Sequence, residues 1–187
     1  MIKTLNIPNL ITLARLLSVP LIATLILLHH LTPAFYLFAL AGLSDALDGF
    51  LARVFKARTT FGAYLDPLAD KALLIGVYVA LARIGLIELW VAILVVFRDV
   101  VIVGGILLLF LFNTSIEMKP HILSKINTVV QLSFALFVLA QGAVFLGFPA
   151  LDTFFGYLVA LTTVLSGVTY IKIGLTYFNS ITYESHE

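Results

Sequence analysis

Apolar side chains run along the chain in six long blocks that short polar breaks separate. Within each block the apolar positions are continuous instead of alternating, which favours helices over strands, and each block reaches the roughly 20 residues that cross the hydrocarbon of a bilayer. We therefore predict an all-α polytopic membrane protein with about six transmembrane helices. The expected spans are Asn9–Leu28, Pro33–Phe55, Phe61–Ile84, Ile87–Phe112, His121–Leu146 and Leu151–Phe178.

The polar breaks are too short to separate two domains, so residues 1–187 are expected to form a single membrane domain. The segment "MIKTLNIP" before the first span is amphipathic enough to lie along the membrane surface. The first block is too long for the core of a signal peptide and lacks a small-x-small cleavage site, so we expect it to be retained.

Composition supports the membrane class, since 61% of the 187 residues are hydrophobic and only 11% are charged. The net charge of +1 gives no indication of nucleic-acid binding, and the absence of cysteine excludes disulfides and thiol chemistry. Most cations fall in alternate breaks and near the two termini, whereas Arg83 stands alone on the other side. The positive-inside rule then places both termini in the cytoplasm. Without a transit-peptide pattern, a bacterial cytoplasmic membrane is favoured over an organellar one.

Four carboxylates interrupt the second and third spans within "SDALDGFLARVFKARTTFGAYLDPLADKA". Asp45 and Asp48 are three residues apart and Asp66 and Asp70 are four apart, so each pair lies on one helical face. An antiparallel hairpin would point all four at a common volume, where they repel by several kcal/mol per pair at an effective dielectric constant of about 20. Oxygen ligands without histidine or cysteine suit Mg²⁺, Mn²⁺ or Ca²⁺. Two such ions are an arrangement used for displacement at phosphorus.

Small residues and an arginine accompany these acids. Gly49 and Gly62 weaken a helix but leave room for a ligand, Ala52 keeps the same face narrow, and Arg53 can bind a phosphate through two hydrogen bonds. The structural alternative is that interfacial aspartates cap helices and that Arg53 only follows the positive-inside rule. The common phasing of four acids favours a functional site, because intramembrane acids are costly.

The pattern D-x2-D-G-x2-A-R-x8-G-x3-D-x3-D resembles the signature of the CDP-alcohol phosphatidyltransferases, with no departure in residue or spacing. The resemblance implies a six-helix membrane fold, usually dimeric, with a site for two Mg²⁺ or Mn²⁺ ions that opens to the cytoplasm. It also implies roles for individual residues: Asp45, Asp48 and Asp66 hold one ion, Asp45, Asp66 and Asp70 hold the other, Asp70 is the general base, and Asp48, Gly49, Ala52, Arg53 and Gly62 surround the CDP group.

A second polar group bears on the acceptor alcohol. Arg98 lies beside an aspartate in the fourth span and Lys125 in the fifth, and together they would form a pocket for an anionic acceptor. The arginine and the aspartate are alternatively a structural pair. Phosphatidylglycerophosphate synthases typically have a second arginine and a second lysine where this chain has Ile106 and Asn127. Fewer cations favour phosphatidylglycerol, a monoanion, over glycerol 3-phosphate, a dianion.

The phrases "RDV" and "KPxxxSKxNTxxQ" also resemble cardiolipin synthases. We therefore favour cardiolipin synthesis from CDP-diacylglycerol and phosphatidylglycerol, with phosphatidylglycerophosphate synthesis as the alternative. A non-enzymatic ion transporter is a remote alternative, because the acids cluster at one end instead of lining a path. Arg15 either extends to the membrane surface or faces the acids as a lipid-phosphate contact, and Lys71 is expected to pair with a carboxylate or a lipid headgroup.

Overall fold

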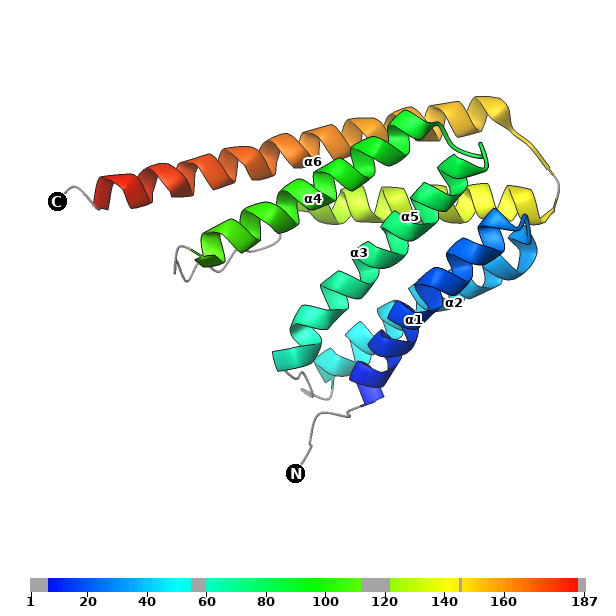
Figure 1. The fold of residues 1–187 in the computed structure, drawn as a ribbon, viewed down its shortest axis with the longest axis horizontal. Helices are drawn as coiled ribbons and strands as arrows, with labels where there is room; N and C mark the ends of the chain where they lie inside the picture. The colour runs from blue at the N-terminus through cyan, green and yellow to red at the C-terminus, as the bar shows by residue number, and fades with distance from the viewer. Residues whose placement is uncertain (1–6, 55–59, 112–121, 145, 185–187) are drawn as a thin grey trace.

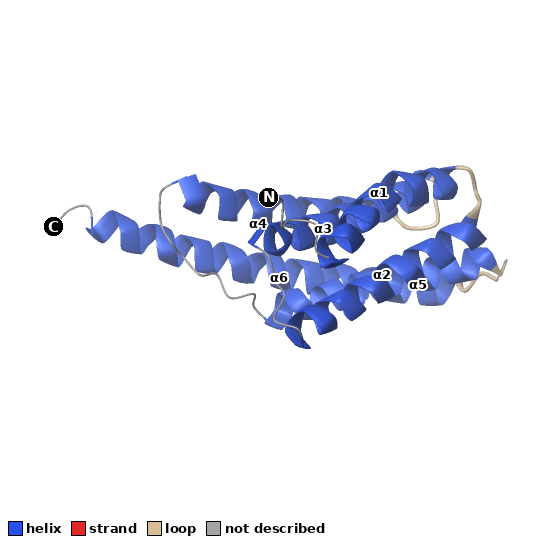
Figure 2. Cartoon of the chain, turned by 90° about the horizontal axis from the view of Figure 1, so that it is seen from below, coloured by secondary structure: helices blue, strands red, loops and turns tan. Residues whose placement is uncertain are grey.

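The computed structural model contains helices joined by loops, and no strands, in the part of the chain that it describes (Figures 1 and 2). It describes the backbone of residues 7–54, 60–111, 122–144 and 146–184, and the side chains of residues 11–44, 68–104, 122–144 and 146–174. Its helices are α1 (Ile7–Leu27), α2 (Leu31–Val54), α3 (Thr60–Arg83), α4 (Leu89–Leu111), α5 (Ile122–Ala143) and α6 (Pro149–Glu184). The expected all-α class is confirmed. Residues 1–6, which make up most of the expected surface segment, lie outside the described part.

Three short connections join helices at one end of the molecule, and local hydrogen bonds define each of them. His29 ends α1 with a left-handed φ of 60°, and Gly85 ends α3 with a φ of 78°, a conformation that glycine adopts without strain. Between α5 and α6 the Gln141 side chain accepts from the Phe148 amide at 2.7 Å and donates to Asp152 at 2.6 Å. We call this end the short-connection end. We call the opposite end the motif end, because the four acids of the motif lie near it, on α2 and α3.

The helices form a closed ring in which each packs on two neighbours, in the order α1, α2, α5, α6, α4, α3 and back to α1; α3 also contacts α5 across the ring. Figure 1 shows α3 between α1 and α4. In the described part α1 packs against both α2 and α3, and no contact between α2 and α3 is found there. The side chains of residues 45–67, where the predicted hairpin would bring the acids together, lie outside the described part, so the common volume for the four acids stays a prediction.

The apolar core fills the half of the bundle near the short-connection end. Its largest fully buried members are Tyr78, Phe38, Ile22, Ile26 and Leu81. Most buried polar side chains lie in the other half, toward the motif end: Thr12, Arg15, Arg98, Asp99, Asn127, Gln131, Thr163 and Ser166. Among the described side chains, the close-packed apolar core and most buried polar groups therefore lie in different halves of the bundle.

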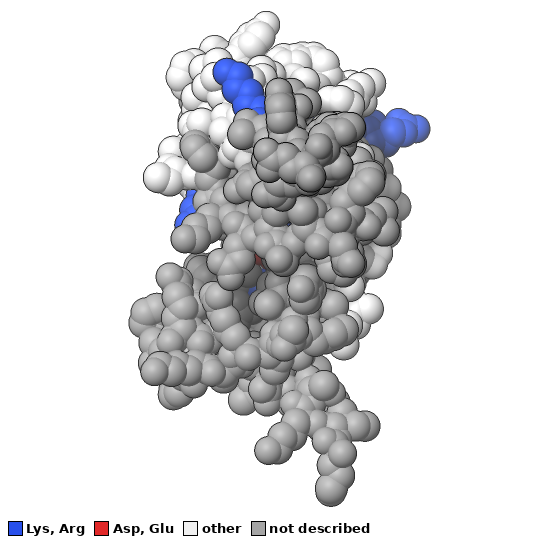
Figure 3. Space-filling model, turned by 90° about the vertical axis from the view of Figure 1, so that its left-hand side faces the viewer, with Lys and Arg blue, Asp and Glu red and all other residues white. Residues whose placement is uncertain are grey.

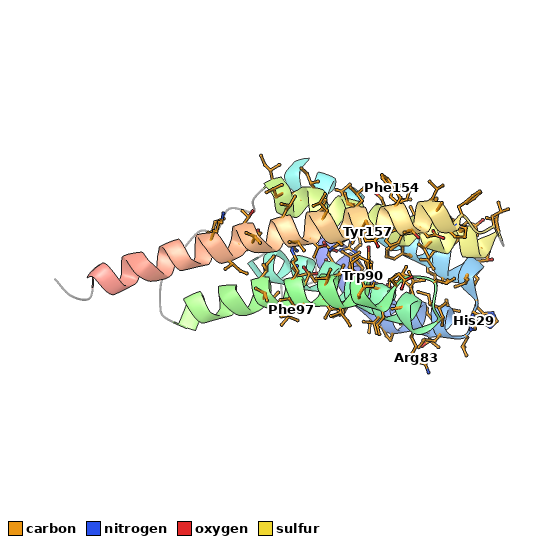
Figure 4. The ribbon with its side chains drawn as sticks, turned by 90° about the horizontal axis from the view of Figure 1, so that it is seen from above. His29, Arg83, Trp90, Phe97, Phe154 and Tyr157 are labelled. Carbon is orange, nitrogen blue, oxygen red and sulfur yellow. The ribbon has the colours of Figure 1, made fainter. Side chains whose placement is uncertain are left out.

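The outside of the bundle carries many exposed apolar side chains, among them Phe97, Phe154 and Tyr157, which Figure 4 shows on α4 and α6. Trp90 packs against Tyr157 in a tilted arrangement, with ring centroids 5.6 Å apart. Two described helical segments, Ile122–Ala143 and Pro149–Gly174, are long and apolar enough to cross a membrane. An apolar outer surface and two such segments indicate a membrane protein; the six spans stay a prediction.

Helix α6 is longer than the span expected from its apolar run. Its 36 residues make a helix of about 54 Å, well over the roughly 30 Å of a hydrocarbon core. Figure 1 shows its carboxyl-terminal part extending past the end of α4. The helix continues because residues 175–184 contain neither proline nor glycine, although they become more polar.

Candidate active site

The four acids of the motif lie on α2 and α3 near the ends that face each other along the chain. Asp48 and Asp66 are equally far from those helix ends, about 9 Å at 1.5 Å per residue, while Asp45 and Asp70 lie about one turn deeper. The backbone therefore brings both pairs to the same depth. Of the side chains, only that of Asp70 belongs to the described part. The side chains of Asp45, Asp48, Gly49, Ala52, Arg53, Gly62 and Asp66 lie outside it, and their roles remain predictions.

Asp70 is paired with an arginine from the first helix. Arg15 Nη1 donates to Asp70 Oδ1 at 3.0 Å, and the side chains are 1% and 38% exposed, respectively. Of the two alternatives for Arg15, the structure thus shows the one in which it faces the acids, since the guanidinium is buried and does not extend to the membrane surface. The buried Arg15 thus holds a partly exposed carboxylate on the neighbouring helix.

The next residue on α3 belongs to a different ion-pair cluster. Lys71 Nζ lies 2.6 Å from Asp99 Oδ1, and the same oxygen accepts from Arg98 Nη1 at 2.6 Å. Arg98 and Asp99 are buried, at 4% and 3% exposure, whereas the Lys71 side chain is 26% exposed. We call Lys71, Asp99 and Arg98 the triad. The expectation that Lys71 pairs with a carboxylate is confirmed.

Besides Asp99 on its own helix α4, Arg98 contacts residues of α5 and α6. Its Nη2 donates to Ser124 on α5 and to Ser166 on α6, each at 2.6 Å, and its Cζ lies 5.9 Å from the centre of the Tyr170 ring. Gly167 on α6 lies beside the arginine stem, where a Cβ would make an ordinary van der Waals contact with Arg98 Cγ at 3.8 Å. Protein groups therefore already surround the Arg98 guanidinium. A direct contact with an acceptor would have to replace one of them.

Lys125, the second predicted acceptor ligand, is exposed on α5 beside Ser124. The structure joins Arg98 to Ser124 and Ser166, which sequence reasoning missed. Serines at these separations from Arg98 give no sequence signal. The position of Lys71 directly after the motif was the only available sign that it would lie near this site.

Asn127, treated in the sequence as a missing cation, lies in a packed seam between α5 and α6. It is fully buried, and its Oδ1 accepts from Thr162 and Thr163 at 2.9 and 3.0 Å. Gln131 also donates to Thr163, at 3.2 Å, and the Tyr78 hydroxyl donates to the Gln131 carbonyl at 2.9 Å. The polar side chain at position 127 therefore has a role in helix packing that the sequence alone did not reveal.

The comparison with known proteins agrees with the motif. A family model described as CDP-alcohol phosphatidyltransferase matches residues 5–173. The chain belongs to the CDP-alcohol phosphatidyltransferase family.

Relatives of this chain carry two different names. A rice protein named CDP-diacylglycerol–glycerol-3-phosphate 3-phosphatidyltransferase 1, chloroplastic, is 38% identical and covers 90% of this chain and 56% of its own length. A probable cardiolipin synthase (CMP-forming) of Drosophila melanogaster is 34% identical, covering 89% of this chain and 57% of its own. A CDP-diacylglycerol–glycerol-3-phosphate 3-phosphatidyltransferase of Rickettsia typhi is 31% identical over 92% of this chain and 99% of its own. The chain spans about half the length of the first two.

The described part of the chain contains one member of the predicted metal site. Asp70 presents a partly exposed carboxylate, the oxygen ligand that hard divalent cations prefer. The described side chains contain no group of three or more acids or histidines that could hold an ion, since the other three acids of the motif lie outside them. The Asp70 carboxylate is compatible with the predicted Mg²⁺ or Mn²⁺, and the two-ion site stays a prediction.

Figure 3 views the molecule from the motif end and shows lysine or arginine side chains of the described part at its edge.

Proposed function

We propose that this protein is a cardiolipin synthase, which transfers a phosphatidyl group from CDP-diacylglycerol to phosphatidylglycerol and releases CMP. The observation that carries the acceptor assignment is the charge of the triad. Its two cations share one carboxylate, so it has a single net positive charge. That charge matches the one negative charge of a phosphodiester better than the two of a phosphomonoester. The relatives named cardiolipin synthase support the same proposal.

Phosphatidylglycerophosphate synthesis from glycerol 3-phosphate is the second candidate. It is favoured by the rice and Rickettsia relatives, whose names specify this activity, the latter matching along nearly its whole length. The two candidates share the donor and the leaving group and differ only in the acceptor alcohol.

Asp70 is the proposed general base. The acceptor hydroxyl oxygen attacks the phosphorus that bears diacylglycerol, the bond between that phosphorus and the pyrophosphate bridging oxygen breaks, and CMP leaves. The hydroxyl proton passes to Asp70, whose partly exposed carboxylate can reach a substrate. Arg15 donates to the same carboxylate and thereby fixes its orientation. Two divalent ions, when bound, supply charge stabilisation for the pyrophosphate.

The remaining contacts follow the family pattern. The proposed metal ligands are Asp45, Asp48, Asp66 and Asp70, and the CDP group is surrounded by Asp48, Gly49, Ala52, Arg53 and Gly62. Arg98 and Lys125 are the acceptor contacts that the sequence predicts; in the structure Arg98 is buried within the triad and Lys125 is exposed on α5. Arg15 also serves as a candidate contact for a lipid phosphate. We further propose a homodimer in a bacterial cytoplasmic membrane, with the motif end and both termini on the cytoplasmic side.

A paired acceptor assay tests the proposal. Purified protein in detergent receives CDP-diacylglycerol and Mg²⁺ or Mn²⁺, together with either phosphatidylglycerol or glycerol 3-phosphate, and the lipid product is identified. Cardiolipin from the first mixture, with CMP released in equal amount, is the expected result. Phosphatidylglycerophosphate from the second mixture alone contradicts the acceptor assignment. Release of CMP without a divalent ion contradicts the metal requirement.

A further inference from the structure

Two cations of the triad differ in their access to a substrate. Arg98 is 4% exposed, and it already donates to Asp99, Ser124 and Ser166. Its Nε is buried and has no hydrogen-bond partner in the described part of the chain. Moving the guanidinium toward a ligand would break bonds to three helices. A buried arginine in such surroundings is better suited to hold other groups in place than to bind a substrate.

Lys71 has the opposite properties. Its side chain is 26% exposed, and its ammonium donates one hydrogen bond within the described part, to Asp99. An ammonium group has three donors, so two are available to a ligand. Lys71 also directly follows Asp70, the proposed base, on the same helix. The accessible cation and the base are therefore carried by one element of the structure.

We propose that Lys71 binds the acceptor phosphate, and that Asp99 and Arg98 are positioning residues that hold its ammonium in place. This inference rests on the proposed function and identifies the residue that recognises the acceptor. Asp99 restrains Lys71 at 2.6 Å, and Arg98 in turn fixes Asp99, so a flexible side chain is held in one orientation. A lysine held in this way adds little further ordering cost when an acceptor binds.

The variant Lys71→Met tests the inference because it leaves the Arg98–Asp99 pair in place. Loss of one charge-assisted hydrogen bond should raise the KM for phosphatidylglycerol about 10- to 100-fold. The KM for CDP-diacylglycerol and kcat should change less than about threefold, since the ammonium is not assigned to the donor or to the chemical step. Lys71→Arg keeps the charge and should recover most of the acceptor affinity.

Arg83→Met is the matched control, because it removes a cation from the other end of α3. Arg83 is exposed at the short-connection end, and Figure 4 shows its side chain pointing away from the bundle. It should leave both KM values unchanged. The inference is overturned if Lys71→Met leaves the acceptor KM unchanged, or if it raises the donor KM by the same factor.

A binding measurement separates this inference from the proposed function. Short-chain phosphatidylglycerol or glycerol 3-phosphate is added without donor, and the thermal unfolding midpoint is followed. At least one of the two should stabilise the wild type and Arg83→Met but not Lys71→Met. Equal stabilisation of all three proteins, or of none, contradicts the role of Lys71. The lipid that the wild type makes in the paired assay decides the acceptor independently. If that lipid is phosphatidylglycerophosphate, the proposed function changes, and the KM comparison between wild type and Lys71→Met is made with glycerol 3-phosphate instead.

Discussion

Replacing Asp70 by asparagine should separate its chemical role from its structural one. In the wild type the hydrogen bond from Arg15 to Asp70 is 3.0 Å long. The amide oxygen of asparagine can still accept this bond, but it cannot take the proton of the acceptor hydroxyl. A hydrogen bond to a charged group contributes about 1.5–3 kcal/mol and a neutral one about 0.5–1.5 kcal/mol, so the loss in the free energy of unfolding should be about 1 kcal/mol. Turnover should fall at least 10²- to 10⁴-fold, the usual contribution of a general base.

Asp70→Ala should behave differently in the stability measurement. It removes the carboxylate that pairs with a guanidinium whose side chain is 1% exposed, and breaking a buried pair costs about 3–5 kcal/mol. Because Asp70 itself is 38% exposed, solvent screens the pair and the cost should lie near the lower limit, about 3 kcal/mol.

The assay combines turnover of CDP-diacylglycerol with the thermal unfolding midpoint in detergent. Asp152→Asn is the control, since this carboxylate also accepts a side-chain hydrogen bond, from Gln141, but lies at the short-connection end. It should retain wild-type turnover. If Asp70→Asn keeps more than about a tenth of the activity, Asp70 is not the base. If Asp70→Ala is as stable as Asp70→Asn, the contact with Arg15 does not stabilise the fold.

Three further substitutions test the packing. Gly76→Ala places a Cβ 2.9 Å from Val19 Cγ1 and should lower the free energy of unfolding by about 1–3 kcal/mol. Adding Val19→Ala to the same chain should largely restore it. If the thermal unfolding midpoint does not recover, α1 and α3 do not approach as closely as the structure shows. Tyr78→Phe removes the 2.9 Å hydrogen bond to the Gln131 carbonyl and should cost about 1 kcal/mol, measured in the same way; an unchanged midpoint would show that the bond contributes nothing. Asn127→Lys puts an ammonium in a fully buried seam and should cost about 3 kcal/mol without improving use of glycerol 3-phosphate, whereas a stable variant with improved use would show that the position faces the acceptor.

Hydropathy predicted the helices well because each long apolar run folds into one helix, even where a proline such as Pro20 lies inside it. The observed α1, α2 and α3 begin and end within a few residues of the expected spans. The end of α6 at Glu184 was missed because helix length depends on backbone continuity as well as on apolar content. The order of helices around the ring was also beyond the sequence, since any of six apolar helices can pack on any other.

The same limit applies to the site. Spacing along one helix placed Asp45 with Asp48 and Asp66 with Asp70, because a 3.6-residue repeat fixes which positions share a face. The partner of Asp70 is 55 residues away on α1, and no local pattern predicts such a contact. Charge balance indicated only that positive groups were needed near the acids.

The position of α3 explains how two neighbouring residues come to have different partners. Successive residues of an α-helix point about 100° apart, so on a helix between two neighbours Asp70 faces α1 and Lys71 faces α4. Both charges are fixed to a helix whose other half is packed in the apolar core around Tyr78 and Leu81. Any displacement of α3 therefore moves the proposed base and the proposed acceptor cation together, because both belong to the same helix.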